Sequence, residues 1–117
     1  MAKTPASRKA KGRRLQQETR DKVLALFEGI LEVGDVLSTT MGDTGSDLKL
    51  SPLAKKHFPF SVECKNTETL NIWKALEQAE KNAAEGTAPL VIFKRNRSKI
   101  YAALDLDVLL ELLSKLK

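Results

Sequence analysis

Three charged residues in the middle of the chain, Asp47, Glu63 and Lys65, could form a site for phosphoryl chemistry. Glu63 and Lys65 lie two residues apart in the stretch FPFSVECKN, so on a β-strand they share one face, with Cα atoms roughly 6.5 Å apart. Two carboxylates that converge on one point can hold Mg²⁺ or Mn²⁺. A lysine beside them could orient or deprotonate an attacking water and stabilise developing phosphoryl charge. The simpler interpretation is an exposed strand face with a weak ion pair, worth about 0–1 kcal/mol.

The residues around this possible site alternate in a way that predicts two strands. One face of the longer strand is apolar and consists of Phe58, Phe60, Val62 and Cys64. Asp47 opens a shorter alternating stretch in which Leu48 and Leu50 take the buried side. If the two strands were antiparallel neighbours, the carboxylates of Asp47 and Glu63 would come together.

The other elements follow from apolar spacing and from turn and capping residues. Helices are predicted over 15–31, 72–86 and 106–117, and strands over 33–40, 47–50, 58–66, 89–94 and 99–104. Asn71 and Asp105 are expected as N-caps, and the connector 51–57 as a loop or short helical turn. The order α-β-β-β-α-β-β-α predicts an α/β fold in which helices flank a mixed β-sheet.

Composition indicates one soluble domain with a basic N-terminal arm. The chain has 117 residues, 42% of them hydrophobic, and no apolar run long enough to span a membrane. Its one cysteine and one histidine exclude an internal disulfide and a Cys/His zinc cluster, which fits the cytoplasm. We expect a flexible arm over 1–14 and a single domain over 15–117.

The net charge of +5 is unevenly distributed and suggests a polyanionic partner, most often nucleic acid. The arm contributes Arg8, Lys9, Lys11, Arg13 and Arg14, and the turn between the last two predicted strands contributes Lys94, Arg95, Arg97 and Lys99. The alternatives are a disordered solubilising tail for the arm and a charge-protected sheet edge for the turn.

An aspartate after a glycine-containing turn, followed by E-x-K at the end of a hydrophobic strand, resembles the PD-(D/E)XK nuclease superfamily. The order of the surrounding helices and strands is similar as well. Within the superfamily, the small size and the polar helix before the motif are most similar to Holliday junction resolvases of the archaeal and bacteriophage type. The resemblance covers roughly residues 15–104, and Ser46 stands where the family pattern has proline.

The resemblance implies a restriction-endonuclease-like fold and a set of site residues. Asp47 and Glu63 would bind metal together with the backbone carbonyl of Cys64, and Lys65 would be the catalytic lysine. The resemblance further suggests Glu18 as an additional catalytic residue and metal ligand, Gln78 as a catalytic residue, and the Ser38 hydroxyl near the scissile phosphate. For Glu18 the alternative is an exposed helix charge.

The expected function is a Mg²⁺-dependent endonuclease, with Mn²⁺ as a possible substitute, that resolves four-way DNA junctions in phage recombination and repair. The final helix carries more apolar residues than one core-facing stripe needs: Leu106, Val108, Leu109, Leu110, Leu112, Leu113 and Leu116. A homodimer through this helix would suit the two-fold symmetry of a four-way junction. The alternatives are another nuclease of the superfamily, such as a nickase or a phage repair or replication nuclease, and a non-catalytic basic DNA-binding protein.

Overall fold

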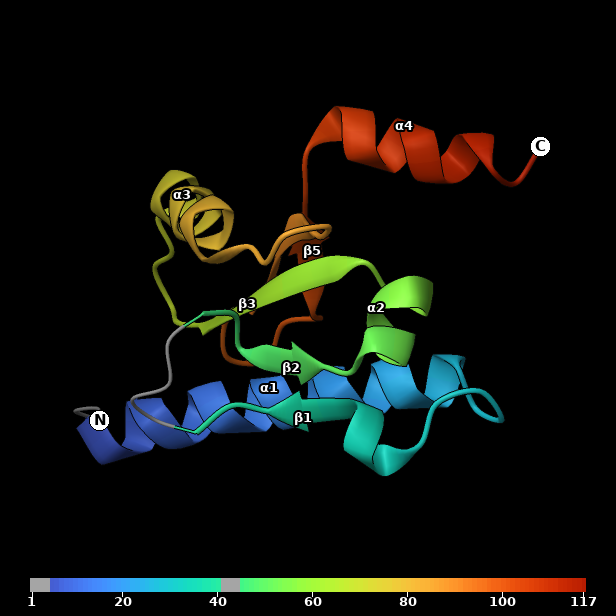
Figure 1. The fold of residues 1–117 in the computed structure, drawn as a ribbon. Coiled ribbons are helices and arrows are strands. Elements are labelled where there is room, and N and C mark those ends of the chain that lie inside the picture. Colours follow the sequence, from blue (N-terminus) through green and yellow to red (C-terminus); the bar gives the residue numbers. More distant parts are fainter. Residues whose placement is uncertain (1–4, 41–44) are drawn as a thin grey trace.

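A computed structural model describes residues 5–40 and 45–117, and it contains the predicted elements together with a short additional helix (Figure 1). The helices are α1 (Pro5–Leu26), α2 (Pro52–His57), α3 (Ile72–Asn82) and α4 (Leu106–Ser114). The strands are β1 (Val36–Ser38), β2 (Leu48–Leu50), β3 (Phe60–Asn66), β4 (Ala88–Lys94) and β5 (Tyr101–Ala103), and a 3₁₀ turn, Val33–Asp35, precedes β1. The connector expected as a loop or helical turn is therefore α2.

The strands form two sheets. β3, β4 and β5 form a mixed sheet in that order, with β3 parallel to β4 and β4 antiparallel to β5. β1 and β2 form a separate antiparallel sheet, in which Ser38 lies opposite Leu48. The predicted α/β fold with a mixed sheet and flanking helices is confirmed. β2 and β3 are not the antiparallel neighbours, joined as a hairpin, that would have brought Asp47 to Glu63: β2 pairs with β1 in one sheet, and β3 pairs with β4 in the other.

Both faces of the mixed sheet are covered, by α1 on one side and by α3 on the other (Figure 1). On the α1 side, Phe60, Val62 and Cys64 of β3 belong to the same core cluster as Leu15 and Val23. On the α3 side, Ala75 and Ala79 pack closely against Val91. Glu63 lies on the α3 side and is only 2% exposed. The interpretation of its strand face as solvent-exposed is therefore wrong.

The basic N-terminal segment is helical wherever the structure describes it. The predicted flexible arm over 1–14 is corrected for residues 5–14, which belong to α1, while residues 1–4 lie outside the described residues. This segment lacks an apolar stripe, but alanine, lysine and arginine are good helix formers. Lys11, assigned to the arm, is only 8% exposed, and its backbone carbonyl accepts a hydrogen bond from Asn66 Nδ2 at 3.3 Å.

The last helix, α4, keeps much of its apolar surface exposed. Asp105 caps it as predicted, accepting a hydrogen bond from the backbone N–H of Asp107 at 2.7 Å. Val108 and Leu112 pack against the core. Four leucines of α4 are 39–65% exposed, Leu106, Leu109, Leu110 and Leu113, and Leu116 in the turn after the helix is 80% exposed. One side of α4 is therefore packed against the core, and its remaining apolar residues are exposed. Among the described residues, no helix combines the length and the apolar character needed to cross a membrane.

Candidate active site

Asp47 lies against the edge of β3 that faces away from β4. Its backbone N–H donates to the Val62 carbonyl at 2.7 Å, and its Oδ2 accepts from the Cys64 backbone N–H at 2.7 Å. The backbone N–H of Thr39, just after β1, donates to the Asp47 carbonyl at 3.0 Å. These bonds bring Asp47 beside Glu63 without a hairpin between their strands.

Cys64 contributes its backbone to this edge and its side chain to the core. A strand residue directs its N–H and C=O to the same side, so the Cys64 carbonyl faces the edge where Asp47 lies. The thiol points toward α1, with Sγ 3.9 Å from Thr19 Oγ1. Burial raises the pKa of this thiol to about 12. The side chain is therefore a protonated core residue and not a nucleophile.

Helix α3 supplies one polar partner to each of the two motif residues on β3. Asn82 Nδ2 donates to Glu63 Oε1 at 2.9 Å, and Lys65 Nζ donates to Gln78 Oε1 at 2.7 Å. Gln78 and Asn82 are four residues apart and so share one face of α3. The sequence analysis named Gln78 but missed Asn82. The spacing of Gln78 and Asn82, two amides four residues apart on the helix that follows the E-x-K strand, could have indicated Asn82.

The two carboxyls are held where ionisation is unfavourable. Burial is the main reason that the pKa of Asp47 is raised, although its bond from the Cys64 N–H and the charge of Lys65 act in the opposite direction. Burial also raises the pKa of Glu63, opposed by the Asn82 hydrogen bond and reinforced by the nearby negative charge of Asp47. The carboxyls therefore interact with each other and with Lys65. A cation between them would relieve both the desolvation and the repulsion.

The donor set suits a hard divalent cation. Within 5–40 and 45–117, no three histidine, cysteine, aspartate or glutamate side chains gather to hold a metal ion. Two carboxylates are too few for a structural zinc site. Mg²⁺ is commonly bound by one or two carboxylates, with waters and substrate phosphate completing its shell. Asp47, Glu63 and the Cys64 carbonyl are therefore a donor set that could hold a magnesium-type ion, with the rest of its shell left for water or phosphate.

Glu18 does not join the pair. It lines a cavity of about 440 Å³ with Lys22, Lys94 and Lys99, beside the β4–β5 turn. Asp47 and Glu63 lie close together, whereas Glu18 of α1 lies beside the β4–β5 turn. Its place among three lysines reflects the rotation of α1, which turns Leu15 and Thr19 toward β3 and Glu18 to the exposed flank.

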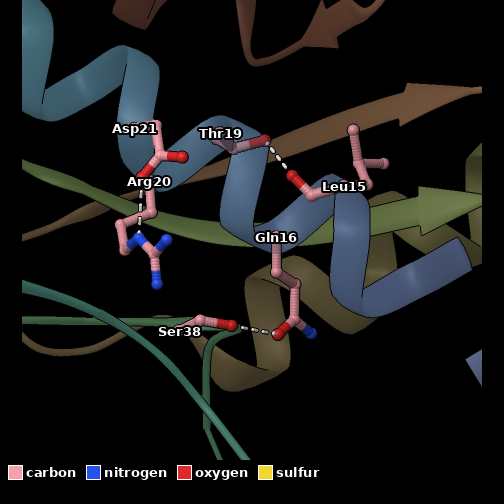
Figure 2. A network of polar contacts seen from close by, with 6 residues as sticks. All are labelled: Leu15, Gln16, Thr19, Arg20, Asp21 and Ser38. Carbon is pink, nitrogen blue, oxygen red and sulfur yellow. Dashed lines mark hydrogen bonds and ion pairs between the residues drawn. The ribbon is translucent and has the colours of Figure 1, made fainter. Parts of the chain in front are cut away.

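Ser38 supports the site through α1. Figure 2 shows its hydroxyl donating to Gln16 Oε1, at 2.8 Å, while Thr19 of the same helix donates to the Leu15 carbonyl at 2.8 Å. Ser38 precedes Thr39, which bonds to the Asp47 backbone. The Gln16–Ser38 contact therefore ties the end of β1, and through it Asp47, to α1.

A comparison with protein families agrees with this geometry. The family model described as "Phage putative PDDEXK endonuclease" matches residues 7–117. The chain belongs to this phage endonuclease family. Searches of curated proteins and of solved structures gave no match. The resemblance to the PD-(D/E)XK superfamily is thereby confirmed, and the chain is a nuclease by family. The narrower resemblance to Holliday junction resolvases stays a prediction.

The basic residues expected to bind DNA lie in two regions of the endonuclease. Arg8, Lys9, Arg13 and Arg14 are exposed along the first half of α1, and Arg95, Arg97 and Lys99 are exposed in the β4–β5 turn, with Lys94 part-buried at its start. The Asn96 backbone N–H donates to Glu68 Oε2 at 2.7 Å, which holds the turn against the segment after β3. Lys11 is the exception, because it is buried.

Asn82→Ala should reduce kcat/KM for DNA cleavage by about 10–100-fold, the usual effect of removing a group that orients a metal ligand. Glu63 would lose its hydrogen-bond donor, and its carboxylate would be less well oriented. Single-turnover cleavage in Mg²⁺ would measure the effect, with Lys81→Ala on the exposed face of α3 as the matched control. Equal rates for the two variants would show that Asn82 does not position Glu63.

Proposed function

We propose that this endonuclease acts on DNA, with Mg²⁺ or Mn²⁺, and resolves Holliday junctions by paired phosphodiester hydrolysis during phage recombination and repair in the host cytoplasm. The observation that carries the proposal is the meeting of the Asp47 and Glu63 carboxylates beside Lys65. Two carboxylates with raised pKa values and an adjacent ammonium suit a cation and a phosphate together.

Each residue of the site has a distinct role in this proposal. Asp47, Glu63 and the Cys64 carbonyl would hold the ion, whose chemistry would be to polarise the scissile phosphate and to lower the pKa of an attacking water. Lys65 orients that water and stabilises negative charge on the phosphoryl oxygens. Gln78 fixes the Lys65 ammonium through their 2.7 Å hydrogen bond. Glu18 is given no catalytic role, because it lies beside the basic turn.

A non-catalytic DNA-binding role fits this arrangement less well. Buried carboxylates repel a DNA phosphate unless a cation lies between them, so a protein that only bound DNA would gain nothing from Asp47 and Glu63. Binding alone would require only the exposed cations of α1 and of the β4–β5 turn. The paired carboxylates therefore favour hydrolysis.

Junction resolution requires two symmetric cuts, and α4 offers a surface for a second subunit. Its exposed leucines recur at helical spacing from Leu106 to Leu116 and would be covered in a two-fold dimer. Light scattering at micromolar concentration should give twice the chain mass, and Leu110→Glu with Leu113→Glu should give the chain mass. A monomeric wild type would contradict the proposed dimer and leave the nuclease centre standing.

Arg95→Ala with Arg97→Ala should weaken binding to all DNA sequences alike. If each arginine contacts one phosphate, the slope of log K against log salt should fall by about 0.9 for each contact. Fluorescence anisotropy between 50 and 200 mM salt would measure the slope, with Lys115→Ala and Lys117→Ala in the turn that follows α4 as a charge-matched control. A loss confined to particular sequences would show base recognition instead.

The substrate proposal is tested by comparing DNA structures. Wild-type protein in Mg²⁺ would be incubated with an end-labelled four-way junction, a linear duplex and a single strand of the same sequence. Paired nicks across the junction, with much slower cutting of the duplex and the single strand, are the expected result. Equal cutting of all three would overturn junction selectivity and indicate a more general nuclease.

A further inference from the structure

A cavity of about 380 Å³ adjoins the Asp47–Glu63 pair, between β2, α2, β3 and the segment after α3. Two of its lining residues are connected to the site, because Ser46 precedes Asp47 and Asn82 bonds to Glu63. Ser61 also lines it, two residues before Glu63 on the same strand face and therefore roughly 6.5 Å away along β3. A DNA strand at the site would place a neighbouring nucleotide at this cavity.

The charge of this cavity distinguishes it from others on the molecule. Among the residues that the structure describes, its lining includes two cations, Lys49 of β2 and Lys55 of α2, and no acidic residue. Three other cavities, at the start of α1, at the β4–β5 turn and under α4, each include a glutamate: Glu68, Glu18 and Glu111. Within 5–40 and 45–117, the charged side chains that line the cavity beside the two buried carboxylates are thus both basic.

The backbone that carries the two lysines is fixed in place. Lys49 is the middle residue of β2 and lies opposite Leu37 of β1. Helix α2 is capped by Ser51, which accepts from the Ala54 N–H at 3.0 Å and donates to Asp35 Oδ1 at 2.7 Å. The backbone at both lysines is therefore tied to the rest of the fold, so that no loop has to become ordered when an anion binds there.

We propose that Lys49 and Lys55 bind a phosphate of the cleaved strand, one or two nucleotides from the scissile phosphate. This inference rests on the proposed function and adds the direction in which the strand leaves the site, along β3 toward α2. Lysine binds phosphate as a point charge and carries no sequence information, so the contact positions the strand without selecting its sequence.

Adjacent lysines on α2 provide a matched pair of variants, since Lys55 lines the cavity and Lys56 does not, although both are exposed. Binding to a labelled junction in EDTA would be measured from 50 to 200 mM salt. Lys55→Ala should lower the slope of log K against log salt by about 0.9, and Lys49→Ala likewise, whereas Lys56→Ala should leave it unchanged. Equal slopes for Lys55→Ala and Lys56→Ala would overturn the proposal.

A modified substrate locates the contact. A neutral methylphosphonate, moved through the positions flanking the cleavage site, should weaken binding of wild type and Lys56→Ala at one or two positions and have no added effect on Lys55→Ala. Equal sensitivity of all three proteins would overturn the proposal. If Lys55→Ala behaves as expected but wild type never cuts DNA in Mg²⁺, the phosphate site stands and the proposed hydrolysis fails. If wild type cuts DNA in Mg²⁺ but Lys55→Ala and Lys56→Ala bind with the same salt dependence, the proposed hydrolysis stands and the phosphate site fails.

Discussion

Lys65→Ala is expected to cut DNA about 10²–10⁴-fold more slowly than wild type in Mg²⁺, the range found when a group that transfers protons or stabilises transition-state charge is removed. Lys65 is half-buried, interacts electrostatically with both carboxyls and is fixed by Gln78 at 2.7 Å. The loss should fall on kcat, because the exposed cations of α1 and of the β4–β5 turn supply most of the DNA affinity.

Three further variants make this result specific. Gln78→Ala should cost less than Lys65→Ala, because the ammonium remains but is less well oriented. Lys65→Arg should restore little, since a guanidinium differs from an ammonium in shape and in the geometry of its hydrogen bonds. Lys74→Ala, an exposed lysine on the first turn of α3, controls for charge. A rate for Lys65→Ala within a few-fold of that control would remove Lys65 from the centre.

Without metal and at neutral pH, Asp47→Asn and Glu63→Gln should melt at a higher temperature than wild type, although both should lose the cleavage activity that wild type has in Mg²⁺. Burial raises the pKa of both carboxyls, so the folded state keeps protons that the unfolded state releases. The resulting stabilisation is present below the ordinary carboxyl pKa, near 4, and is lost as pH rises through the raised folded values. Each amide remains uncharged and can still accept the existing hydrogen bond.

Thermal melts between pH 4 and 8 in EDTA would measure this effect. The difference in melting temperature between each variant and wild type should grow as pH rises and disappear near pH 4. Glu80→Gln, on the exposed face of α3, should melt at the wild-type temperature across this range. Adding Mg²⁺ should raise the melting temperature of wild type and have little effect on Asp47→Asn, because only an intact pair binds the ion well. Parallel curves for all proteins would show that the carboxyls are not under electrostatic strain.

Much of this arrangement could be predicted from local sequence. Alternation around Glu63 and Lys65 predicted β3, and the caps Asn71 and Asp105 marked the starts of α3 and α4 as observed. The meeting of Asp47 with Glu63 was also expected. The reason for it was different, because Asp47 is held by two hydrogen bonds at the edge of β3 and not by a shared hairpin.

The remaining features depend on tertiary contacts that periodicity does not encode. The polar face of β3 looked solvent-exposed in sequence, but α3 covers it, and Asn82 and Gln78 satisfy its charged groups. The start of α1 was not predicted because residues 5–14 have no apolar stripe. Lys11 is buried where α1 meets Asn66 at the end of β3, a contact that the local sequence does not reveal. The position of Glu18 depends on which side of α1 faces β3, and the sequence of the helix does not determine this.

The most direct test of the Asp47–Glu63–Lys65 centre is cleavage of an end-labelled four-way junction by wild type and by Asp47→Asn, each in Mg²⁺ and in EDTA, with DNA binding measured in parallel. We predict that wild type cuts in Mg²⁺ and not in EDTA, and that Asp47→Asn binds the junction without cutting it in either condition. Cutting in EDTA, or cutting by Asp47→Asn at the wild-type rate, would contradict the assignment of these residues as a metal-dependent nuclease centre.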